Sequence, residues 1–463
     1  MTLVQPPRVV PICCAPRKAP CPHCGKAARR KRVLRRKVRS IAYKQIVHLH
    51  ITYGEYQARC GCQKTFRTHP DGVLPKHHYD NQVRDAVLEH ILDGHLNVEA
   101  TLRSLRRDFL LELSQGFVYD CLHDAVRRLD MADYRRQVLE RFRGTLCVDE
   151  IHLGDYTLLL ATDPLADLPV AFALVSSNDQ DHMRRFLKNL KDWGLSPQVV
   201  VTDGSNLYPA VLAELWPTAE HQLCVFHVMQ DINAEILEGV KRLRRHKARQ
   251  GHAGRQPKRG RRAKRAKKRR RGPTAKEKAH FVFKHRHLIV KRRENLTAAE
   301  KKDLRVMLEY IPGLRLLRRF ADRVYVLLSE EQTEEQAWRR WRRLQGEKAF
   351  QAVPELAAVL KLLPEEKFRK VIAFLRQPVG RRVRTNNHVE RVNRRLRYWE
   401  KVRYKWRRQR TLVRFVVLVL SGLWQEQFDY PPCEGAAAVP GVLPFEEREE
   451  AGQPKGQLHR RAA

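Results

Sequence analysis

The stretches TLCVDEI (residues 145–151) and QVVVTDGS (residues 198–205) decide the fold, because each contains a short apolar run that leads directly into a carboxylate. Short apolar runs rich in β-branched residues are typical of buried strands. Asp149 and Asp203 stand where these two strands end. A carboxylate in that position loses hydration and needs a cation beside it. Two such strand ends on adjacent strands would form a metal site.

The sequence around these runs predicts a mixed sheet with helices on its faces. We expect strands at residues 145–151, 156–162, 169–175, 198–202 and 222–226, and helices at about 181–193 and 206–215. Three successive strands followed by alternating strand and helix is the order expected of a ribonuclease-H-like domain. The first and fourth strands of that order are neighbours, so Asp149 and Asp203 would face one another at one edge. Two carboxylates that leave positions for a substrate phosphate suit Mg²⁺.

Glu390 is the best candidate for the third acid that two-ion phosphodiester chemistry commonly uses. It lies in a segment of helical spacing, residues 387–399, whose apolar stripe begins with Val389 and Val392. Asn386 and Asn387 precede Glu390 on nearly the same side of this helix. The face around Glu390 is basic and would carry the DNA backbone past the metal ions. Its arginines are Arg391, Arg394 and Arg397.

Two other carboxylates compete for a place in this site. Glu150 points to the opposite face of its strand from Asp149, since side chains alternate along a strand. Asp163 precedes Pro164, as a turn residue would. Both positions favour the triad of Asp149, Asp203 and Glu390.

Residues 1–78 predict a small, basic, β-rich DNA-binding module that holds one structural Zn²⁺. Cys21 and Cys24 form one close pair and Cys60 and Cys62 form a second. Four thiolates that reach one tetrahedral ion from two turns are typical of a zinc ribbon. A module with so small a core gains much of its stability from such a metal. Three nearby side chains remain alternative ligands: Cys13, Cys14 and His23.

Residues 79–135 show three short helical patterns separated by Asp93-Gly94 and by residues 114–116, which is the layout of a helix-turn-helix unit. The third helix begins near Ser114 and would lie in the major groove of DNA. Its polar side would offer Tyr119, His123, Arg127 and Arg128 to the DNA. An ordinary helical linker domain is the alternative.

The rest of the chain is predicted to be largely helical. We expect residues 144–228 to be the first part of a catalytic core and residues 386–428 to return to it. Between them, residues 229–385 predict an all-helical insertion that contains a basic, flexible run at 255–271. Residues 429–463 are expected to be a disordered tail. Trp338 and Trp341 in the insertion are helix-packing residues or, less often in such settings, platforms for an unpaired base.

The charge of the chain indicates nucleic acid as its partner. There are 91 Lys and Arg against 51 Asp and Glu among 463 residues, so the formal net charge is +40. Such self-repulsion is relieved by a polyanion, and an anionic membrane surface is the weaker alternative. No membrane span is predicted, because the longest apolar stretch, residues 412–423, is broken by Arg414 and Gly422. No secretory signal is visible, so we expect the protein in the cytoplasm.

Taken together, these motifs resemble bacterial insertion-sequence transposases with a DDE catalytic domain, of the ISL-three type. The resemblance runs over about residues 13–425. It rests on CPHC at 21–24, a cysteine pair before KTF at 64–66, the three-helix unit, VDE at 148–150, VTDG at 201–204, CVFH at 224–227 and NN at 386–387. It implies that Asp149, Asp203 and Glu390 are the catalytic metal ligands. It also implies that Cys224 and His227 form a C-x-x-H element that supports the active site.

The resemblance implies a DNA transposase that binds the terminal inverted repeats of an insertion sequence. Two Mg²⁺ ions, or Mn²⁺ in their place, would serve strand cleavage and strand transfer to target DNA. A homodimer or larger assembly on double-stranded DNA, near the bacterial nucleoid, is expected because two ends must be joined. A non-catalytic DNA-binding regulator is the first alternative, and loss of a carboxylate would favour it. A structure-specific nuclease is the second, although it needs no pair of sequence-reading modules.

Overall fold

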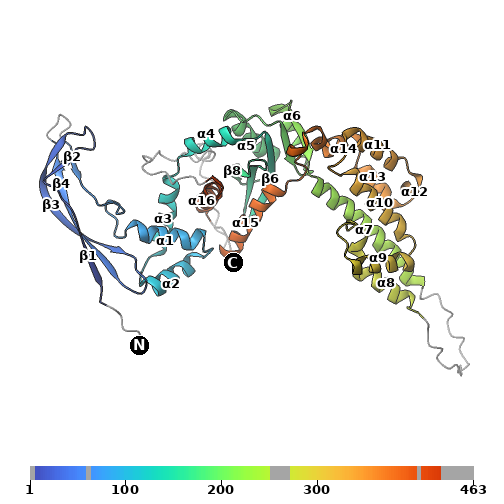
Figure 1. Cartoon of the computed structure of the whole chain (residues 1–463), viewed down its shortest axis with the longest axis horizontal. Coiled ribbons are helices and arrows are strands. Elements are labelled where there is room, and N and C mark those ends of the chain that lie inside the picture. The colour runs from blue at the N-terminus through green and yellow to red at the C-terminus, as the bar shows by residue number, and fades with distance from the viewer. Residues whose placement is uncertain (1–5, 59–63, 251–271, 404–407, 429–463) are drawn as a thin grey trace, which may run out of the picture. The chain divides into compact units, whose positions relative to one another are not determined.

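The computed structural model describes residues 6–58, 64–250, 272–403 and 408–428 (Figure 1). The chain divides into two compact units. One consists of Met1–Gln137, His152–Thr157 and Asn393–Ala463, and the other of Val138–Ile151 and Leu158–Val392. The predicted basic run at 255–271 and the predicted tail at 429–463 lie outside the described residues.

A mixed five-stranded sheet forms the N-terminal part of the first unit. Its strands lie in the order β1-β4-β3-β2, and β5 pairs with β4. β1 runs parallel to β4, whereas β2–β3, β3–β4 and β4–β5 are antiparallel. The strands are β1 (Arg8–Cys14), β2 (Lys18–Pro20), β3 (Ala27–Ser40), β4 (Val47–Gln57) and β5 (Thr65–Arg67).

Three helices follow, in the segments where the spacing predicts them. They are α1 (Asn81–Leu92), α2 (Val98–Phe109) and α3 (Gln115–Arg127). The side chains of Asp80, Asn97 and Ser114 each accept a backbone N–H of the first turn, which fixes where the helices begin. Leu110 adopts a left-handed conformation, with φ of 53°, and ends α2. The three helices pack against one another, and α16 (Gln409–Phe428) packs against α3.

The second sheet has the strand order β10-β9-β6-β7-β8. Its strands are β6 (Thr145–Leu153), β7 (Tyr156–Asp163), β8 (Leu168–Val175), β9 (Val199–Thr202) and β10 (Glu220–Leu223). The prediction that the first and fourth strands are neighbours is confirmed, since β6 pairs with β9 in parallel. The predicted end of the fifth strand is wrong, because Val225 and Phe226 belong to the following helix.

Helices α4 (Met131–Arg141), α5 (Gln180–Asp192) and α6 (Pro209–Leu215) accompany this sheet. α5 packs against β8 and α6. Its buried face is built from Met183, Phe186, Leu187 and Leu190, which recur at helical spacing. Two mixed sheets with many helices give a mixed α/β protein, which is consistent with a ribonuclease-H-like enzyme fold.

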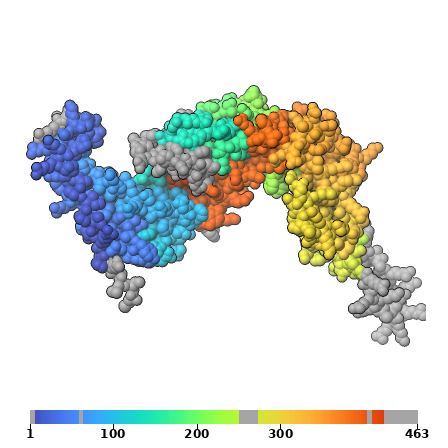
Figure 2. Space-filling view, viewed as in Figure 1, coloured from blue at the N-terminus to red at the C-terminus, as the bar shows by residue number. Residues whose placement is uncertain are grey.

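Between β10 and α15 (Asn387–Arg403), the described residues contain helices only, as the sequence predicts for the insertion. These helices are α7 (Val225–Gln250), α8 (Ala275–Lys284), α9 (Ala298–Tyr310), α10 (Leu314–Leu327), α11 (Glu334–Gln345), α12 (Lys348–Gln351), α13 (Pro354–Leu362) and α14 (Glu365–Val371), with short 3₁₀ turns at Arg286–Ile289, Ala373–Arg376 and Val379–Arg381. They share one hydrophobic core that includes Ile236, Phe320 and Phe368, and they form a continuous packed body (Figure 2, yellow to orange).

Gln222 of β10 fastens the end of this insertion to the sheet. Its side chain donates to the Val371 carbonyl (2.8 Å) and accepts the Phe374 N–H (2.6 Å), and it is fully buried. Arg376 forms a second connection, because it forms ion pairs with Glu220 of β10 and with Glu334 of α11. In the part of the chain that is described, no helix is both long enough and apolar enough to cross a membrane.

Candidate active site

Asp149 and Asp203 stand at the same level of two adjacent parallel strands. Cys147 of β6 pairs with Val201 of β9, and each aspartate lies two residues further along its strand direction. Asp203 directly follows β9, whereas β6 continues beyond Asp149 to Leu153, so the prediction that Asp149 ends its strand is wrong. The parallel register still brings the two sequence-predicted aspartates together.

Cys224 ends the next parallel strand of the same edge. Leu223 of β10 pairs with Thr202 of β9, and the Cys224 N–H donates to the Thr202 carbonyl at 2.8 Å. Cys224 is fully buried. His227 follows in the first turn of α7, so the C-x-x-H spacing places a thiol at the strand end and an imidazole one helical turn away.

Backbone and amide hydrogen bonds bring the segment before α15 to these strand ends. The Val225 N–H donates to the Arg384 carbonyl at 2.8 Å. The Asn386 N–H donates to Cys224 Sγ at 3.2 Å, and its side-chain amide donates to the Val148 carbonyl at 3.0 Å. Asn386 is thus hydrogen-bonded both to Cys224, which follows β10, and to Val148 of β6, the residue before Asp149.

Glu390 lies in the first turn of α15, directly after the segment that these contacts hold. Its N–H donates to the Asn386 carbonyl at 3.1 Å, and its Oε1 lies 3.7 Å from His227 Nε2. One donor atom each of Cys224, His227 and Glu390 lies within 4.8 Å of the other two. Residues separated by more than 160 positions in the sequence therefore meet at one point.

The electrostatics of this site favour a bound cation. Burial, together with the neighbouring carboxylates of Glu150 and Asp203, raises the pKa of Asp149 to about 7. Interaction with the Cys224 thiol is the main cause that raises the pKa of His227 to about 9, with Glu390 and Asp149 adding to it. Glu390 Oε1 is buried and accepts no hydrogen bond from the described residues. Crowded carboxylates with an unsatisfied buried oxygen fit a divalent ion, and the hard oxygens of Asp149, Asp203 and Glu390 suit Mg²⁺.

Glu150 is hydrogen-bonded by side chains that no sequence pattern indicates. It accepts a hydrogen bond from the buried Tyr208 hydroxyl and another from the Asn178 amide at 3.2 Å. Tyr208 precedes α6 and Asn178 lies in a loop, so neither position carries a recognisable sequence signal. Asp163 accepts the N–H groups of Arg143, Leu165 and Ala166, which confirms that it stabilises a turn.

The remaining predicted residues of the core lie on the surface of α15. Asn387, Arg391, Arg394 and Arg397 are all exposed. Arg391 lies 3.5 Å from Asp167, which also contacts His388 at 2.6 Å. The stripe that begins with Val389 and Val392 is buried, as predicted. Of the Asn-Asn pair, only Asn386 belongs to the interior of the site.

The predicted zinc ligands are described in part. Cys21 is buried and Cys24 is exposed in the turn between β2 and β3, where Gly25 has a φ of +70°. Cys60 and Cys62 lie outside the described residues. The strands that flank them, β4 and β5, remain paired up to a hydrogen bond from the Ala58 N–H to the Lys64 carbonyl (3.0 Å).

The predicted DNA contacts of α3 differ in their exposure to solvent. Tyr119, Arg127 and Arg128 are exposed. His123 is half-buried, and its pKa is lowered by this burial and by the nearby charges of Arg414 and Arg127. α16, which carries Arg414, therefore borders the polar side of α3.

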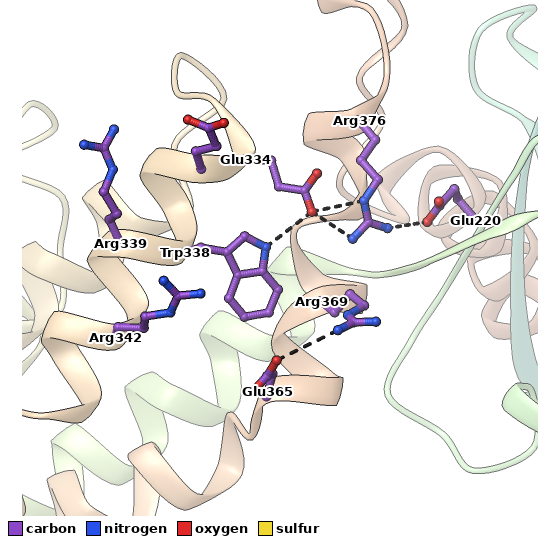
Figure 3. Close-up of a pocket in the computed structure, with 9 residues that line it drawn as sticks. Glu220, Glu334, Trp338, Arg339, Arg342, Glu365, Arg369 and Arg376 are labelled. Atoms are coloured by element: carbon purple, nitrogen blue, oxygen red, sulfur yellow. Dashed lines mark hydrogen bonds and ion pairs between the residues drawn. The ribbon is translucent and has the colours of Figure 1, made fainter.

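Trp338 and Trp341 pack in the helical insertion. Trp341 stacks on Phe368 with 5.5 Å between ring centroids, and its Nε1 donates to the Leu363 carbonyl. Trp338 lines a pocket of about 930 Å³ (Figure 3). The charged lining of this pocket is balanced between four glutamates and four arginines: Glu220, Glu334, Glu335, Glu365, Arg339, Arg342, Arg369 and Arg376. Packing, rather than base stacking, accounts for both tryptophans.

The strand order and the carboxylates at one sheet edge are consistent with the class of ribonuclease-H-like enzymes. A family model described as transposase, that of the DDE transposases of the ISL-three type, matches residues 146–412. The chain belongs to this family of transposases, which confirms the resemblance seen in its sequence. Among solved structures, the Drosophila P element transposase strand transfer complex is similar over 74% of this chain and 91% of that chain, with 10% sequence identity and a TM-score of 0.33. No curated protein matches the chain.

Proposed function

We propose that this transposase binds the terminal inverted repeats of an insertion sequence and catalyses metal-dependent DNA cleavage and strand transfer. The observation that supports the proposal is that Asp149 and Asp203 each lie two residues beyond the paired Cys147 and Val201, and that His227 interacts with both Asp149 and Glu390. When bound, a pair of Mg²⁺ or Mn²⁺ ions supplies stabilisation of the attacking and leaving oxygens of a phosphodiester.

The side chains of the site have separate roles in this proposal. The carboxylates of Asp149, Asp203 and Glu390 hold the ions, and a bound ion displaces the proton that Asp149 otherwise keeps near neutral pH. Cys224 and Asn386 position Glu390 through the hydrogen bonds described above. The exposed Arg391, Arg394 and Arg397 guide the DNA backbone.

The proposal is tested by cleavage and joining of DNA that carries the flanking inverted repeats, with Mg²⁺ or Mn²⁺. We expect Asp203→Asn to lower the cleavage rate by at least about 1000-fold, because a metal ligand is removed. Asp192→Asn, at the exposed end of α5, is the matched control and should cleave like the wild type. Cleavage by Asp203→Asn at the wild-type rate would remove Asp203 from the site.

We propose that one structural Zn²⁺ is held by Cys21, Cys24, Cys60 and Cys62. Support comes from the pairing of β3 with both β2 and β4, because Ala27–Arg29 pairs with β2 while Arg29 and Arg30 pair with Gln57 and Tyr56. The turn at Cys21–Cys24 and the paired ends of β4 and β5 therefore lie at the same end of the sheet. Elemental analysis of the full chain should find one zinc per chain, and Cys24→Ser should lose it. Zinc retained in full by that variant would contradict this ligand set.

We propose that α1–α3 are a helix-turn-helix that reads the repeat sequence, with Tyr119, His123, Arg127 and Arg128 as its contacts. The exposure of the two arginines at the end of α3 supports this assignment. A homodimer or larger assembly on DNA follows from the need to join two ends, and light scattering of the DNA complex measures it.

A further inference from the structure

The N-terminal sheet has one open face, which we define by Arg35, Lys37 and Arg39 of β3 and His48, His50 and Thr52 of β4. The strand register places them in three rows: Arg35 pairs with Thr52, Lys37 with His50, and Arg39 with His48. Paired residues point to the same side of a sheet. β1 continues the same rows, with Cys13 opposite Thr52 and Pro11 opposite His50.

The alternate residues of the same strands form the core on the other side. Val38, Leu49 and Ile51 are buried there and pack with Val73, which comes from the chain beyond β5. The period of two along β3 therefore separates an apolar face from a basic one. The basic side remains uncovered: Arg35, Lys37 and His50 are exposed in the middle of their strands.

The open face carries charge of one sign only. It holds two arginines, one lysine and two histidines, and no carboxylate stands in any of its three rows. Arg39 donates to the Leu110 carbonyl at 3.0 Å, which directs its guanidinium toward the end of α2. Arg35 and Lys37 form no ion pair with any carboxylate in the described part of the chain, although the same sheet pairs Arg32 and Arg67 with Glu55 on its other side.

We propose that the open face binds the phosphate backbone of duplex DNA, with Arg35 and Lys37 as its principal phosphate contacts. This inference rests on the proposed function, to which it adds a phosphate-binding face on the sheet of the zinc module, separate from α3. Arg35 and Lys37 lie two residues apart on one strand, so their Cα atoms are about 7 Å apart. Arg35 and Lys37, with hydroxyl and imidazole groups beside them on an open sheet face, provide charge and hydrogen-bond donors for phosphates.

DNA fits this face better than an anionic membrane does. A surface helix or loop that binds a bilayer inserts large apolar side chains beside its basic ones. The three rows of the open face offer only Val9, Pro11 and Cys13 in that role, all at the β1 edge. Arg35 and Lys37, which form no ion pair in the described part of the chain, suit a contact that is sequence-independent and sensitive to salt.

The test is the salt dependence of DNA binding by the full chain, measured without added Mg²⁺ on a repeat-end duplex and on a scrambled duplex of equal length. We expect the double variant Arg35→Ala/Lys37→Ala to bind both duplexes at least about tenfold more weakly at 0.1 M salt. The slope of log K against log salt should fall in magnitude by about 2, because two phosphates are no longer neutralised. Arg35→Lys/Lys37→Arg keeps both charges and should keep the wild-type slope.

Lys301→Ala/Lys302→Ala in α9 is the control, because it removes the same charge from exposed positions beside Glu300 and Asp303. An unchanged slope in the Arg35/Lys37 variant would overturn the proposal, as would a loss of affinity for the repeat-end duplex alone. Loss of binding to anionic lipid vesicles with unchanged DNA binding would also overturn it. If the wild type binds DNA with the expected slope but never cleaves it, the open face stands and the proposed chemistry fails.

Discussion

Asn386 concentrates three hydrogen bonds on one buried residue. Its backbone N–H, its backbone carbonyl and its side-chain amide contact Cys224, Glu390 and Val148 respectively. These partners belong to the end of β10, the first turn of α15 and β6. A substitution of Asn386 therefore changes the position of the Glu390 side chain but not the chemical nature of its carboxylate.

We predict that Asn386→Ala destabilises the fold and slows DNA cleavage without weakening DNA binding. The buried Val148 carbonyl loses its partner, which costs about 1–3 kcal/mol of unfolding free energy. Glu390 loses its positioning residue, so the cleavage rate falls while the dissociation constant for DNA stays at the wild-type value. Asn387→Ala, the exposed neighbour, should change neither quantity. Equal behaviour of the two variants would contradict the positioning role.

His221 gives the sheet edge a dependence on pH. Its Nε2 lies 2.9 Å from the Thr202 hydroxyl, which in turn donates to the Asp203 carbonyl at 2.9 Å. Burial is the main cause that lowers the pKa of His221 to about 4, and Lys370 adds to it. The folded protein therefore keeps the neutral imidazole, with its proton directed at Thr202.

We predict that acidification destabilises the wild type more than His221→Gln. A folded pKa near 4 lies below the unfolded value of about 6.5, so the unfolded chain takes up the proton first and stability is lost as the pH falls from 6.5 towards 4. Between pH 7 and pH 5 this group alone contributes a loss of about 2 kcal/mol. Denaturant unfolding at both pH values measures it, and an equal loss in His221→Gln would contradict the assignment.

At the scale of elements, β10 is the strand that connects the sheet to the helical insertion. The buried side chain of Gln222 in this strand forms hydrogen bonds with the Val371 carbonyl and the Phe374 N–H. Both groups lie on the path that leads from α14 to Arg384 and Asn386. The hydrogen bonds of Gln222 therefore hold the helical insertion against the sheet and also help to position the segment that carries Glu390.

We predict that Gln222→Leu destabilises the protein by about 2–4 kcal/mol, because two buried backbone groups lose their partners. Gln198→Ala, an exposed glutamine just before β9, is the matched control and should stay within about 0.5 kcal/mol of the wild type. Thermal or denaturant unfolding of the full chain measures both. A Gln222→Leu variant as stable as the control would show that the insertion is held by its apolar contacts alone.

Local patterns predict the elements of the second sheet well. The runs at residues 146–148 and 199–201, which lead into Asp149 and Asp203, are wholly apolar and therefore predict buried strands. The end of β10 is harder to predict, because the apolar run continues through Val225 and Phe226 into α7 and hydrophobicity alone does not mark where the strand ends. The contacts of Asn386 and Tyr208 join distant segments, so no local pattern announces them.

The N-terminal sheet is harder to predict in detail. β3 carries basic residues at most positions, and its apolar signal is limited to residues such as Val38. β1 pairs in parallel with β4, almost 40 residues away, and its partners are set by tertiary contacts rather than by a turn. The cysteine spacing indicates the turn at Cys21–Cys24, but it carries no information about the edge strand β1.

At the scale of the whole molecule, a net charge of +40 makes stability depend on the solution. Like charges repel most strongly in the compact state, and bound polyanions or added salt reduce that repulsion. Part of the charge lies on the open face and part on α15, which are surfaces with separate roles in the proposals above.

We predict that duplex DNA raises the unfolding temperature of the full chain at low salt. Ligand at 100 times its dissociation constant adds about 2.7 kcal/mol to the free energy of unfolding. The increment should disappear in about 1 M salt, where charges are screened within roughly 3 Å. An uncharged polymer at equal mass concentration is the control. A rise that persists at high salt would indicate that the complex does not depend mainly on charge.

The hydrogen bond from the Val225 N–H to the Arg384 carbonyl affects how the length of the helical insertion can change during evolution. The polypeptide leaves the sheet edge and returns to it at nearly the same point, so the loop between has its ends clamped whatever its length. Lengthening a closed loop adds only a small entropic cost. The number of residues between Asp203 and Glu390 can therefore change during evolution, and additions or deletions that spare Val371 and Phe374 leave the geometry of the acids intact.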